Sequence, residues 1–382
     1  MRARAVLAAS LAGLLGLASL ARAAAPLPPQ PAGVAWPTRG WPEGGPVAGV
    51  DHTALETAVA KLFAPVGRAG LPDTRALLVV AGGRIVLERY ANGFGRESRF
   101  RSWSMAKSVT QCLAGILVRD GRLSLDARAP VPAWQQRAGD PRAALTLRQL
   151  LHMTSGLDNG DGGEDDDADR FVAKLMFGEW AGDTAKAAEK PDLAHEPDTF
   201  WAYSTATSQI VSDIVGRTVG GGREGVRAFA DRELAAPLGI RSLVLEFDAA
   251  ETMLGGGYVW ASARDWARLG LLYLRDGRWE GRRILPEGWV EFTRTPAPAA
   301  NNRTYGAHFW LSGEPGPGQF QTLRPGIEAF QMNGNAGQFV VMVPDRDLVV
   351  VRLGEMHVAT WRDLHEGLGE LIQLFPARGA RP

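Results

Sequence analysis

The chain has 382 residues, of which 45% are hydrophobic and 22% are charged, a composition typical of a soluble globular protein. Lysine plus arginine (42) balance aspartate plus glutamate (42), so the net charge of zero favours neither nucleic acid nor a membrane surface as a partner. The single cysteine, Cys112, excludes an internal disulfide framework. Its place in an apolar segment is typical of a small buried hydrophobe.

The first 25 residues differ from the rest of the chain. A basic start, Met1–Arg4, precedes the apolar run Ala5–Leu20, and small residues stand before Pro26. This pattern is typical of a secretory signal peptide, and the apolar run is shorter than the ~20 residues that cross a bilayer. We therefore expect residues 1–25 to be a leader, residues 26–382 to be an exported domain (periplasmic or secreted), and no membrane-spanning helix.

Strand patterns lie near both ends of the mature chain. Residues 76–80 and 84–90 are rich in apolar and β-branched side chains and flank Ala81-Gly82-Gly83, which predicts a hairpin. Residues 338–343 and 348–353 predict a second hairpin.

Helical periodicity dominates between these hairpins. This order predicts an α/β (α+β) fold, with an antiparallel sheet from about 55–100 and 305–375 and a mainly helical insertion from about 101–300. The expected helices, besides the one described next, are 55–63, 145–151, 206–219, 223–236, 262–276, 286–295 and 359–374.

A further helix is predicted within residues 101–123, where apolar residues at 109, 113, 116 and 117 share one face. Asp120-Gly121 predicts its end, and Ser102 or Ser104 could cap its start. Ser104 and Lys107 are three residues apart, so they lie on the same face of the first turn.

The pair of Ser104 and Lys107 has chemical meaning. A serine hydroxyl is a poor nucleophile until a neighbouring base takes its proton, and lysine can do so only if its pKa is lowered. Only five of the 42 basic residues are lysines, and Lys107 alone has a serine three positions before it. Taken alone, this pattern fits a surface lysine beside an ordinary serine equally well.

The segment Asp158–Asp169 is acidic and rich in glycine. Its spacing does not match the helix-loop-helix calcium pattern, so we interpret it as a solvated loop, with a calcium site as the alternative.

The sequence lacks the motifs of two other classes of hydrolase. No serine lies in Gly-x-Ser-x-Gly, which an α/β-hydrolase would show, and the six histidines form neither H-E-x-x-H nor a close pair.

Several motifs occur in the order known from one family. The chain resembles the serine β-lactamase/penicillin-recognising superfamily in its class C-like branch, and within it the 6-aminohexanoate-dimer hydrolase and related esterases. The resemblance covers about residues 60–375 and implies a β-lactamase/transpeptidase-like fold. The matching segments are Ser104–Lys107, Leu150–Leu157, Tyr203-Ser204-Thr205, Gly255–Gly257 with Ser262–Asp265, and Gly334–Gln338 with the strand after it.

The resemblance implies a role for each site residue. It makes Ser104 the nucleophile, Lys107 its base and Tyr203 a proton-transfer residue acting with the lysine. Backbone N–H groups of Ser104 and Asn335 would bind the oxyanion, and no cofactor or metal is implied. Substrate contacts are expected from Trp103, Trp201, Thr205 and Gly334.

Two departures from the family pattern bear on the substrate. Thr205 stands where the family has asparagine, and Asn333-Gly334-Asn335 replaces the Lys-Thr-Gly of true β-lactamases. Because that lysine would bind a carboxylate, its absence favours a small neutral ester or amide. The alternatives are a D,D-peptidase or β-lactamase acting on cell-wall-like amides, or an inactive binding or scaffold protein of the same fold.

Overall fold

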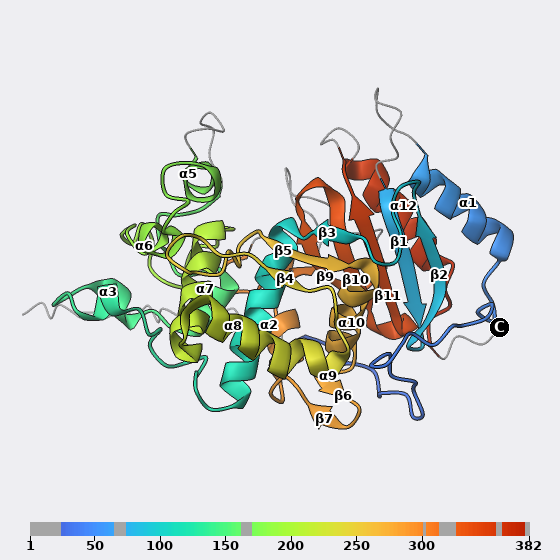
Figure 1. The fold of residues 1–382 in the computed structure, drawn as a ribbon, viewed down its shortest axis with the longest axis horizontal. Coiled ribbons are helices and arrows are strands. Elements are labelled where there is room, and N and C mark those ends of the chain that lie inside the picture. The colour runs from blue at the N-terminus through green and yellow to red at the C-terminus, as the bar shows by residue number, and fades with distance from the viewer. Residues whose placement is uncertain are drawn as a thin grey trace, which may run out of the picture.

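A computed structural model gives the structure of residues 24–64, 74–161, 170–300, 303–312, 326–356 and 361–378. The predicted leader lies outside these ranges except for its last two residues, as do residues 162–169 of the acidic loop. Figure 1 shows a sheet on the right and a mainly helical region on the left.

The main sheet has six antiparallel strands and is built from two distant parts of the chain. Its central strands are continuous apolar runs because both of their faces are buried. Both predicted hairpins are confirmed, and the first turns at Gly82 and Gly83, which have positive φ. The strands lie in the order β2 (Arg84–Tyr90), β1 (Thr74–Ala81), β11 (Leu348–Gly354), β10 (Gln338–Val343), β9 (Phe330–Gly334) and β8 (Trp310–Leu311).

Each face of the sheet has its own hydrophobic core. Helices α1 (His52–Phe63) and α12 (Trp361–Gln373) cover the outer face, where Leu62 and Leu368 pack on Val341 and neighbouring strand residues. On the inner face α10 (Ala263–Leu274) lies against the central strands and joins the larger core of the helical region. The sheet therefore forms a middle layer between two sets of helices (Figure 1).

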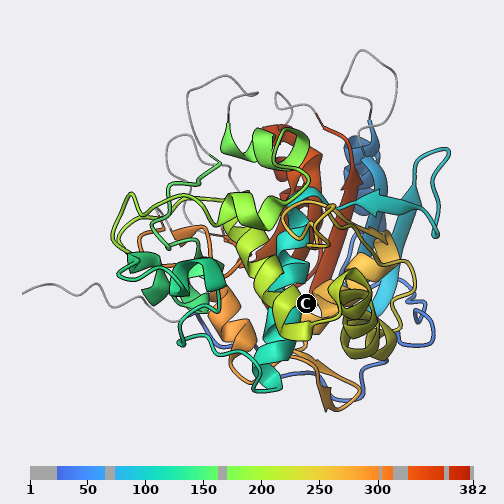
Figure 2. The ribbon, with the colours of Figure 1, turned by 60° about the vertical axis from the view of Figure 1, so that its left-hand side comes forward.

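In the helical region α2 and α7 are packed side by side (Figure 2). A second sheet, in the order β3 (Arg99–Arg101), β5 (Val259–Ser262) and β4 (Val244–Leu245), leads the chain into α2, and β6 (Arg278–Trp279) and β7 (Arg282–Arg283) form a small ribbon. The remaining elements are α2 (Ala106–Arg119), α3 (Pro132–Gln135), η2 (Pro141–Ala144), α4 (Leu147–His152), α5 (Phe171–Phe177), α6 (Thr184–Ala188), α7 (Thr205–Val219), α8 (Gly222–Ala230), η3 (Asp231–Ala235), α9 (Ala236–Leu238), α11 (Trp289–Arg294), η5 (Asn335–Gly337) and η6 (Pro344–Arg346).

The start of the central helix differs from the sequence prediction. Ser104 lies in a 3-10 turn, η1 (Trp103–Met105), and α2 begins only at Ala106. Neither Ser102 nor Ser104 caps a helix, because Ser102 Oγ instead donates to the Trp103 carbonyl and accepts from the Val259 N–H. The predicted end is confirmed, with Gly121 at φ +68°.

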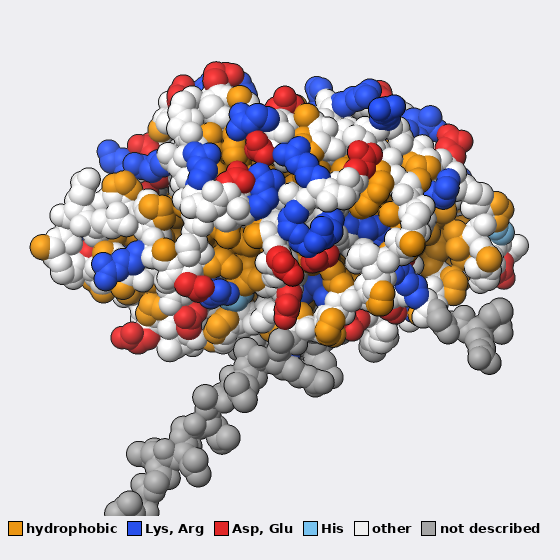
Figure 3. Space-filling view, turned by 90° about the horizontal axis from the view of Figure 1, so that it is seen from below, with side chains coloured by type: hydrophobic (Ala, Val, Ile, Leu, Met, Phe, Trp, Pro, Cys, Tyr) orange, Lys and Arg blue, Asp and Glu red, His pale blue; other side chains and the backbone are white. Residues whose placement is uncertain are grey.

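The surface mixes charges of both signs. On the face seen in Figure 3, basic and acidic side chains are interspersed, in keeping with the net charge of zero. Within the described ranges, no helix combines the length and apolar character needed to cross a membrane.

The close approach of α10 to the sheet gives a stability prediction. A Cβ added at Gly270 would lie 2.7 Å from methyl carbons of both Val340 and Val349. We expect Gly270→Ala to lower the free energy of unfolding by about 1–3 kcal/mol, because the added carbon overpacks a rigid contact. Denaturant unfolding followed by circular dichroism measures this change.

A second helical glycine supplies the control. At Gly216 in α7, the nearest neighbour of an added Cβ is a methyl carbon of Val226 at 3.8 Å, an ordinary contact. Gly216→Ala should therefore be neutral or stabilise by up to about 1 kcal/mol through helix propensity. Equal effects of the two substitutions would contradict the packing explanation.

Candidate active site

Ser104 is presented by a strained turn at the wall of a cavity. Trp103, directly before it, has φ +46°, a conformation that costs a bulky residue free energy and therefore needs support from its surroundings. The turn joins β3 to α2 and places half-buried Ser104 on a cavity of about 600 Å³. Because Ser104 lies in the first turn of η1, its N–H has no partner within that helix.

Lys107 lies one turn further on and is 1% exposed. Its amine nitrogen, Nζ, is 3.1 Å from Ser104 Oγ, 2.9 Å from Thr205 Oγ1 and 2.8 Å from the Gly256 carbonyl oxygen. The three partners come from η1, the start of α7 and the Gly255–Gly257 turn. The lysine is therefore fixed from three sides rather than free to move.

The buried position changes the protonation of this lysine. Burial lowers the pKa of the Lys107 ammonium from 10.5 to about 8, and the nearby Asp161 carboxylate opposes this decrease. About one tenth of the amine is therefore unprotonated at pH 7 and about half at pH 8, the form in which it can accept a proton from Ser104.

Tyr203 lies beside this pair. Lys107 Nζ is 4.9 Å from the centre of the Tyr203 ring. Burial raises the pKa of the Tyr203 phenol well above its usual 10, although interaction with the Ser104 hydroxyl lowers it. The phenol is therefore un-ionised at rest, so Lys107 is the better base.

Aromatic rings form the surroundings of Tyr203. Ring centres of Tyr305 and Trp310 lie 5.8 Å and 5.4 Å from that of Tyr203. Trp201, an expected cleft residue, packs on Tyr305 at 5.3 Å and is not among the residues that line the Ser104 cavity. The Trp201 side chain thus supports the cluster behind the tyrosine.

The Gly255–Gly257 turn has no room for side chains. A Cβ at Gly256 would lie 2.8 Å from Thr205 Cγ2, and one at Gly255 would lie 2.2 Å from Thr110 Oγ1. The backbone can thus approach closely enough for the Gly256 carbonyl to accept from Lys107. The sequence predicted that the backbone passes close to another segment here, but it did not identify Lys107 as the partner.

The sequence interpretation missed one site residue, Asp161. Its Oδ2 accepts from Thr205 Oγ1 at 2.6 Å, and its Oδ1 accepts from the Thr205 N–H at 2.7 Å. The preceding residues also bind the second motif, since Asn159 Oδ1 accepts from Ser204 Oγ at 3.0 Å. This first part of the acidic segment is therefore not a solvated loop, and the calcium alternative concerns residues 162–169, outside the described ranges.

The third motif comes to the same cavity from β9. Asn335 lines the cavity with Ser104. Gly334, expected to contact substrate, is not among the lining residues and packs on the backbone instead, since a Cβ there would lie 2.1 Å from the Ser102 carbonyl oxygen. Buried Arg352 holds the turn in place by donating to the Gly337 carbonyl at 2.8 Å. Asn335 is thus positioned beside the nucleophile, where the resemblance expects an oxyanion donor.

Apolar side chains form much of the remaining cavity wall. Trp103 and Tyr258 line it from η1 and the glycine turn, and Met176 and Phe177 line it from α5. The guanidinium of Arg101 lies between the two aromatic rings, 3.8 Å from the Trp103 centre and 4.1 Å from the Tyr258 centre. These side chains suit an apolar substrate group, and Asp161 and Arg170 add charged groups to the same cavity.

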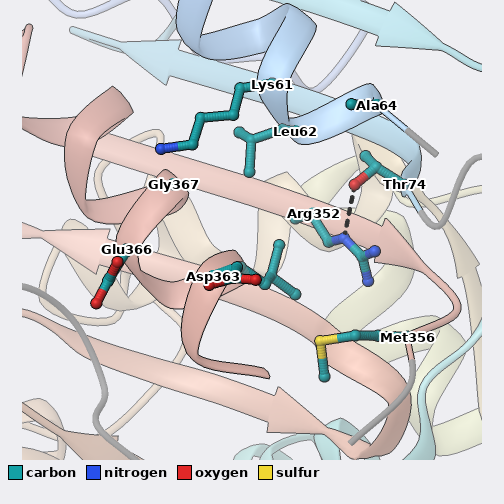
Figure 4. A pocket seen from close by; sticks show the side chains of 10 residues that line it. Lys61, Leu62, Ala64, Thr74, Arg352, Met356, Asp363, Glu366 and Gly367 are labelled. Carbon is teal, nitrogen blue, oxygen red and sulfur yellow. Dashed lines mark hydrogen bonds between the residues drawn. The ribbon is translucent and has the colours of Figure 1, made fainter. Parts of the chain in front are cut away.

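A separate cavity lies between α1, α12 and the outer face of the sheet (Figure 4). There Arg352 Nε donates to Thr74 Oγ1 at 3.1 Å, and neither Ser104 nor Lys107 reaches this cavity.

Cys112 is also removed from the chemistry, because burial raises the pKa of its thiol to about 12. In the described ranges, no group of three or more His, Cys, Asp and Glu could hold a metal.

The chain is similar in sequence to known proteins. The model of the family described as Beta-lactamase matches residues 59–355. A 6-aminohexanoate-dimer hydrolase of Paenarthrobacter ureafaciens is 28% identical over 225 residues, which cover 57% of this chain and 56% of that protein. The alignment thus spans little more than half the length of that relative.

Solved structures share the fold. A Bacillus anthracis protein provisionally assigned as a 6-aminohexanoate-dimer hydrolase superposes with a TM-score of 0.66 at 18% identity, covering 90% of this chain and 91% of that one. A D-stereospecific amidohydrolase from Streptomyces sp. gives 0.58 at 19% identity, covering 85% and 98%. The predicted β-lactamase/transpeptidase-like fold is therefore confirmed.

The lowered pKa of Lys107 can be measured directly, because the chain has few lysines. In protein labelled with ¹⁵N at lysine Nζ, the Lys107 signal is identified by its absence from the spectrum of a Lys107→Met variant. In the wild type this signal should titrate near pH 8. Titration of that signal at 10.5 or above would show that the amine is not desolvated as described.

Proposed function

Because the chain belongs to the beta-lactamase family, we propose that it is a serine hydrolase that cleaves a carboxylic ester or amide through an acyl-serine intermediate on Ser104. One observation carries the proposal: the buried amine of Lys107 lies 3.1 Å from the Ser104 hydroxyl and has a pKa lowered to about 8. This arrangement provides a nucleophile with a base of suitable strength in contact.

In the proposed acylation, Lys107 accepts the proton of Ser104 while Oγ attacks the substrate carbonyl carbon. The carbonyl oxygen becomes an oxyanion that the N–H groups of Ser104 and Asn335 stabilise. Loss of one such donor typically costs about 2.7–4 kcal/mol of transition-state stabilisation. The resulting tetrahedral intermediate then collapses, and its bond to the leaving group breaks.

Tyr203 completes the proton transfer. Its un-ionised phenol donates a proton to the leaving alcohol or amine and is reprotonated from the Lys107 ammonium, which returns the lysine to its neutral form. A water molecule then attacks the acyl carbon while the neutral Lys107 removes its proton. The bond to Ser104 Oγ breaks, the Lys107 ammonium returns the proton to Oγ, and the carboxylic acid leaves.

The proposed substrate is a small neutral ester or amide with an apolar group. Met176, Phe177 and Tyr258 provide an apolar wall, and the third motif lacks the lysine that would bind a carboxylate. The relatives include proteins named 6-aminohexanoate-dimer hydrolase and D-stereospecific amidohydrolase. Short-chain esters, linear amides, D-amino-acid peptides and nitrocefin together form the panel that separates these substrate classes.

We also propose that the protein is exported, on the basis of its N-terminal leader pattern. Amino-terminal sequencing of the protein from periplasmic and medium fractions tests this. Recovery of the uncleaved leader on cytoplasmic protein would contradict export.

Removal of the nucleophile provides the first test of function. We expect Ser104→Ala to lower kcat/KM for p-nitrophenyl butyrate by about 10³-fold or more, since no acyl-enzyme can form. A fluorophosphonate probe should label the wild type and fail to label this variant. Ser98→Ala, outside the cavity, should keep both activity and labelling, and wild-type turnover by Ser104→Ala would refute the assignment.

The pH dependence of turnover tests the base. Because the neutral amine is the active form, kcat/KM should rise with pH along a limb whose apparent pKa is near 8 and fall steeply below it. Lys107→Arg should remove most activity, since arginine keeps its proton in proteins. Lys186→Arg, at the one exposed residue of α6, is the control, and an active Lys107→Arg enzyme would place the base elsewhere.

A further inference from the structure

We propose that Asp161 is a positioning residue that acts through Thr205 to direct the lone pair of Lys107 toward Ser104. The proposal rests on the proposed function of Ser104 and Lys107 and adds a residue to it. Thr205 stands at the motif position where the resemblance expects asparagine, and Asp161 accepts hydrogen bonds from both its N–H and its hydroxyl.

The direction of the hydrogen bonds follows from Asp161. Its two oxygens accept the N–H and the O–H of Thr205 at 2.7 Å and 2.6 Å, the pattern of an ionised carboxylate that only accepts. The single hydroxyl hydrogen of Thr205 is thereby committed to Asp161. Thr205 Oγ1 can face Lys107 Nζ, 2.9 Å away, only as an acceptor.

Counting the hydrogens and lone pairs in the same way fixes the orientation of the Lys107 amine. A neutral amine carries two hydrogens and one lone pair besides its carbon. The Gly256 carbonyl oxygen at 2.8 Å accepts one hydrogen, and Thr205 Oγ1 accepts the other. The lone pair of Lys107 is then left for the third neighbour, Ser104 Oγ at 3.1 Å, which can donate its proton to it.

Without the carboxylate, this direction is lost. An asparagine at position 161 would keep its oxygen on the Thr205 N–H and present its NH₂ group to Thr205 Oγ1. The hydroxyl hydrogen of Thr205 would then turn toward Lys107 and compete with Ser104 for the lone pair. The side chain at 161 thus controls the lysine through Thr205.

Asp161 also acts on Lys107 by its charge. The titratable groups facing the lysine are Asp161, Tyr203 and His308, and burial keeps the last two neutral by raising the pKa of Tyr203 and lowering that of His308 to about 3. Burial raises the pKa of Asp161, and the charge of Lys107 and the hydrogen bonds from Thr205 oppose this increase. The ionised Asp161 carboxylate in turn raises the pKa of Lys107. Its removal should therefore increase the neutral fraction of the amine while misdirecting the lone pair.

The experiment measures pre-steady-state acylation and the pH profile of kcat/KM with p-nitrophenyl butyrate. We expect Asp161→Asn to lower the plateau by about 10- to 100-fold, the size of one lost charge-assisted hydrogen bond. Its acid limb should move to lower pH, a shift that a merely structural role would not produce. Asp158→Asn, an exposed carboxylate in the same segment, is the matched control.

Variants of Thr205 test whether Asp161 acts on Lys107 through Thr205. Thr205→Val should lose as much activity as Asp161→Asn, whereas Thr205→Ser, which keeps the hydroxyl, should recover most of it. In the double variant Asp161→Asn/Thr205→Val the losses should not multiply, because both changes break one chain of hydrogen bonds. If Asp161→Asn does not fold, the difference in activity between Thr205→Val and Thr205→Ser tests the proposal instead.

The outcomes separate the two proposals. An inactive Ser104→Ala with an undiminished Asp161→Asn plateau would overturn the role of Asp161 and leave the hydrolase intact. Multiplying losses in the double variant, or an active Thr205→Val, would also overturn it. Wild-type turnover by Ser104→Ala would instead overturn the proposed function itself.

Discussion

The structure depends on one interaction, in which the buried amine of a lysine lies next to the hydroxyl of a serine. Burial of a lysine is costly unless its hydrogens find acceptors, and here Thr205 and the Gly256 carbonyl supply them. This requirement brings the start of α7 and the Gly255–Gly257 turn against the first turn of α2.

The sheet serves the same site from the other side. Strand β9 ends at Gly334, and the next residue, Asn335, lines the cavity. The close contact of Gly334 with the Ser102 backbone leaves no room for a side chain. The strained turn at Trp103 is held between this contact and α2.

Two opposing effects set the protonation of the site. Burial lowers the pKa of Lys107, and the Asp161 carboxylate raises it. The balance leaves a base that works near neutral pH, while the phenol of Tyr203 stays un-ionised because its own surroundings are aromatic. The acceptor network and the charge balance therefore depend on the same carboxylate.

The sequence by itself determined the terminal hairpins, the main helices and the local pairing of Ser104 with Lys107. These features rest on periodicity and on spacing within one helical turn, both of which are local. Short strands such as β3, β4 and β8 were missed because two or three residues carry no period.

Only the tertiary structure decided which distant groups complete the site. The Gly256 carbonyl has no sequence signal, and Asp161 was hidden among the other carboxylates of an acidic segment. Their contacts with Lys107 and Thr205 arise because α2 and α7 pack together, and packing between segments far apart in the chain leaves no trace in local spacing.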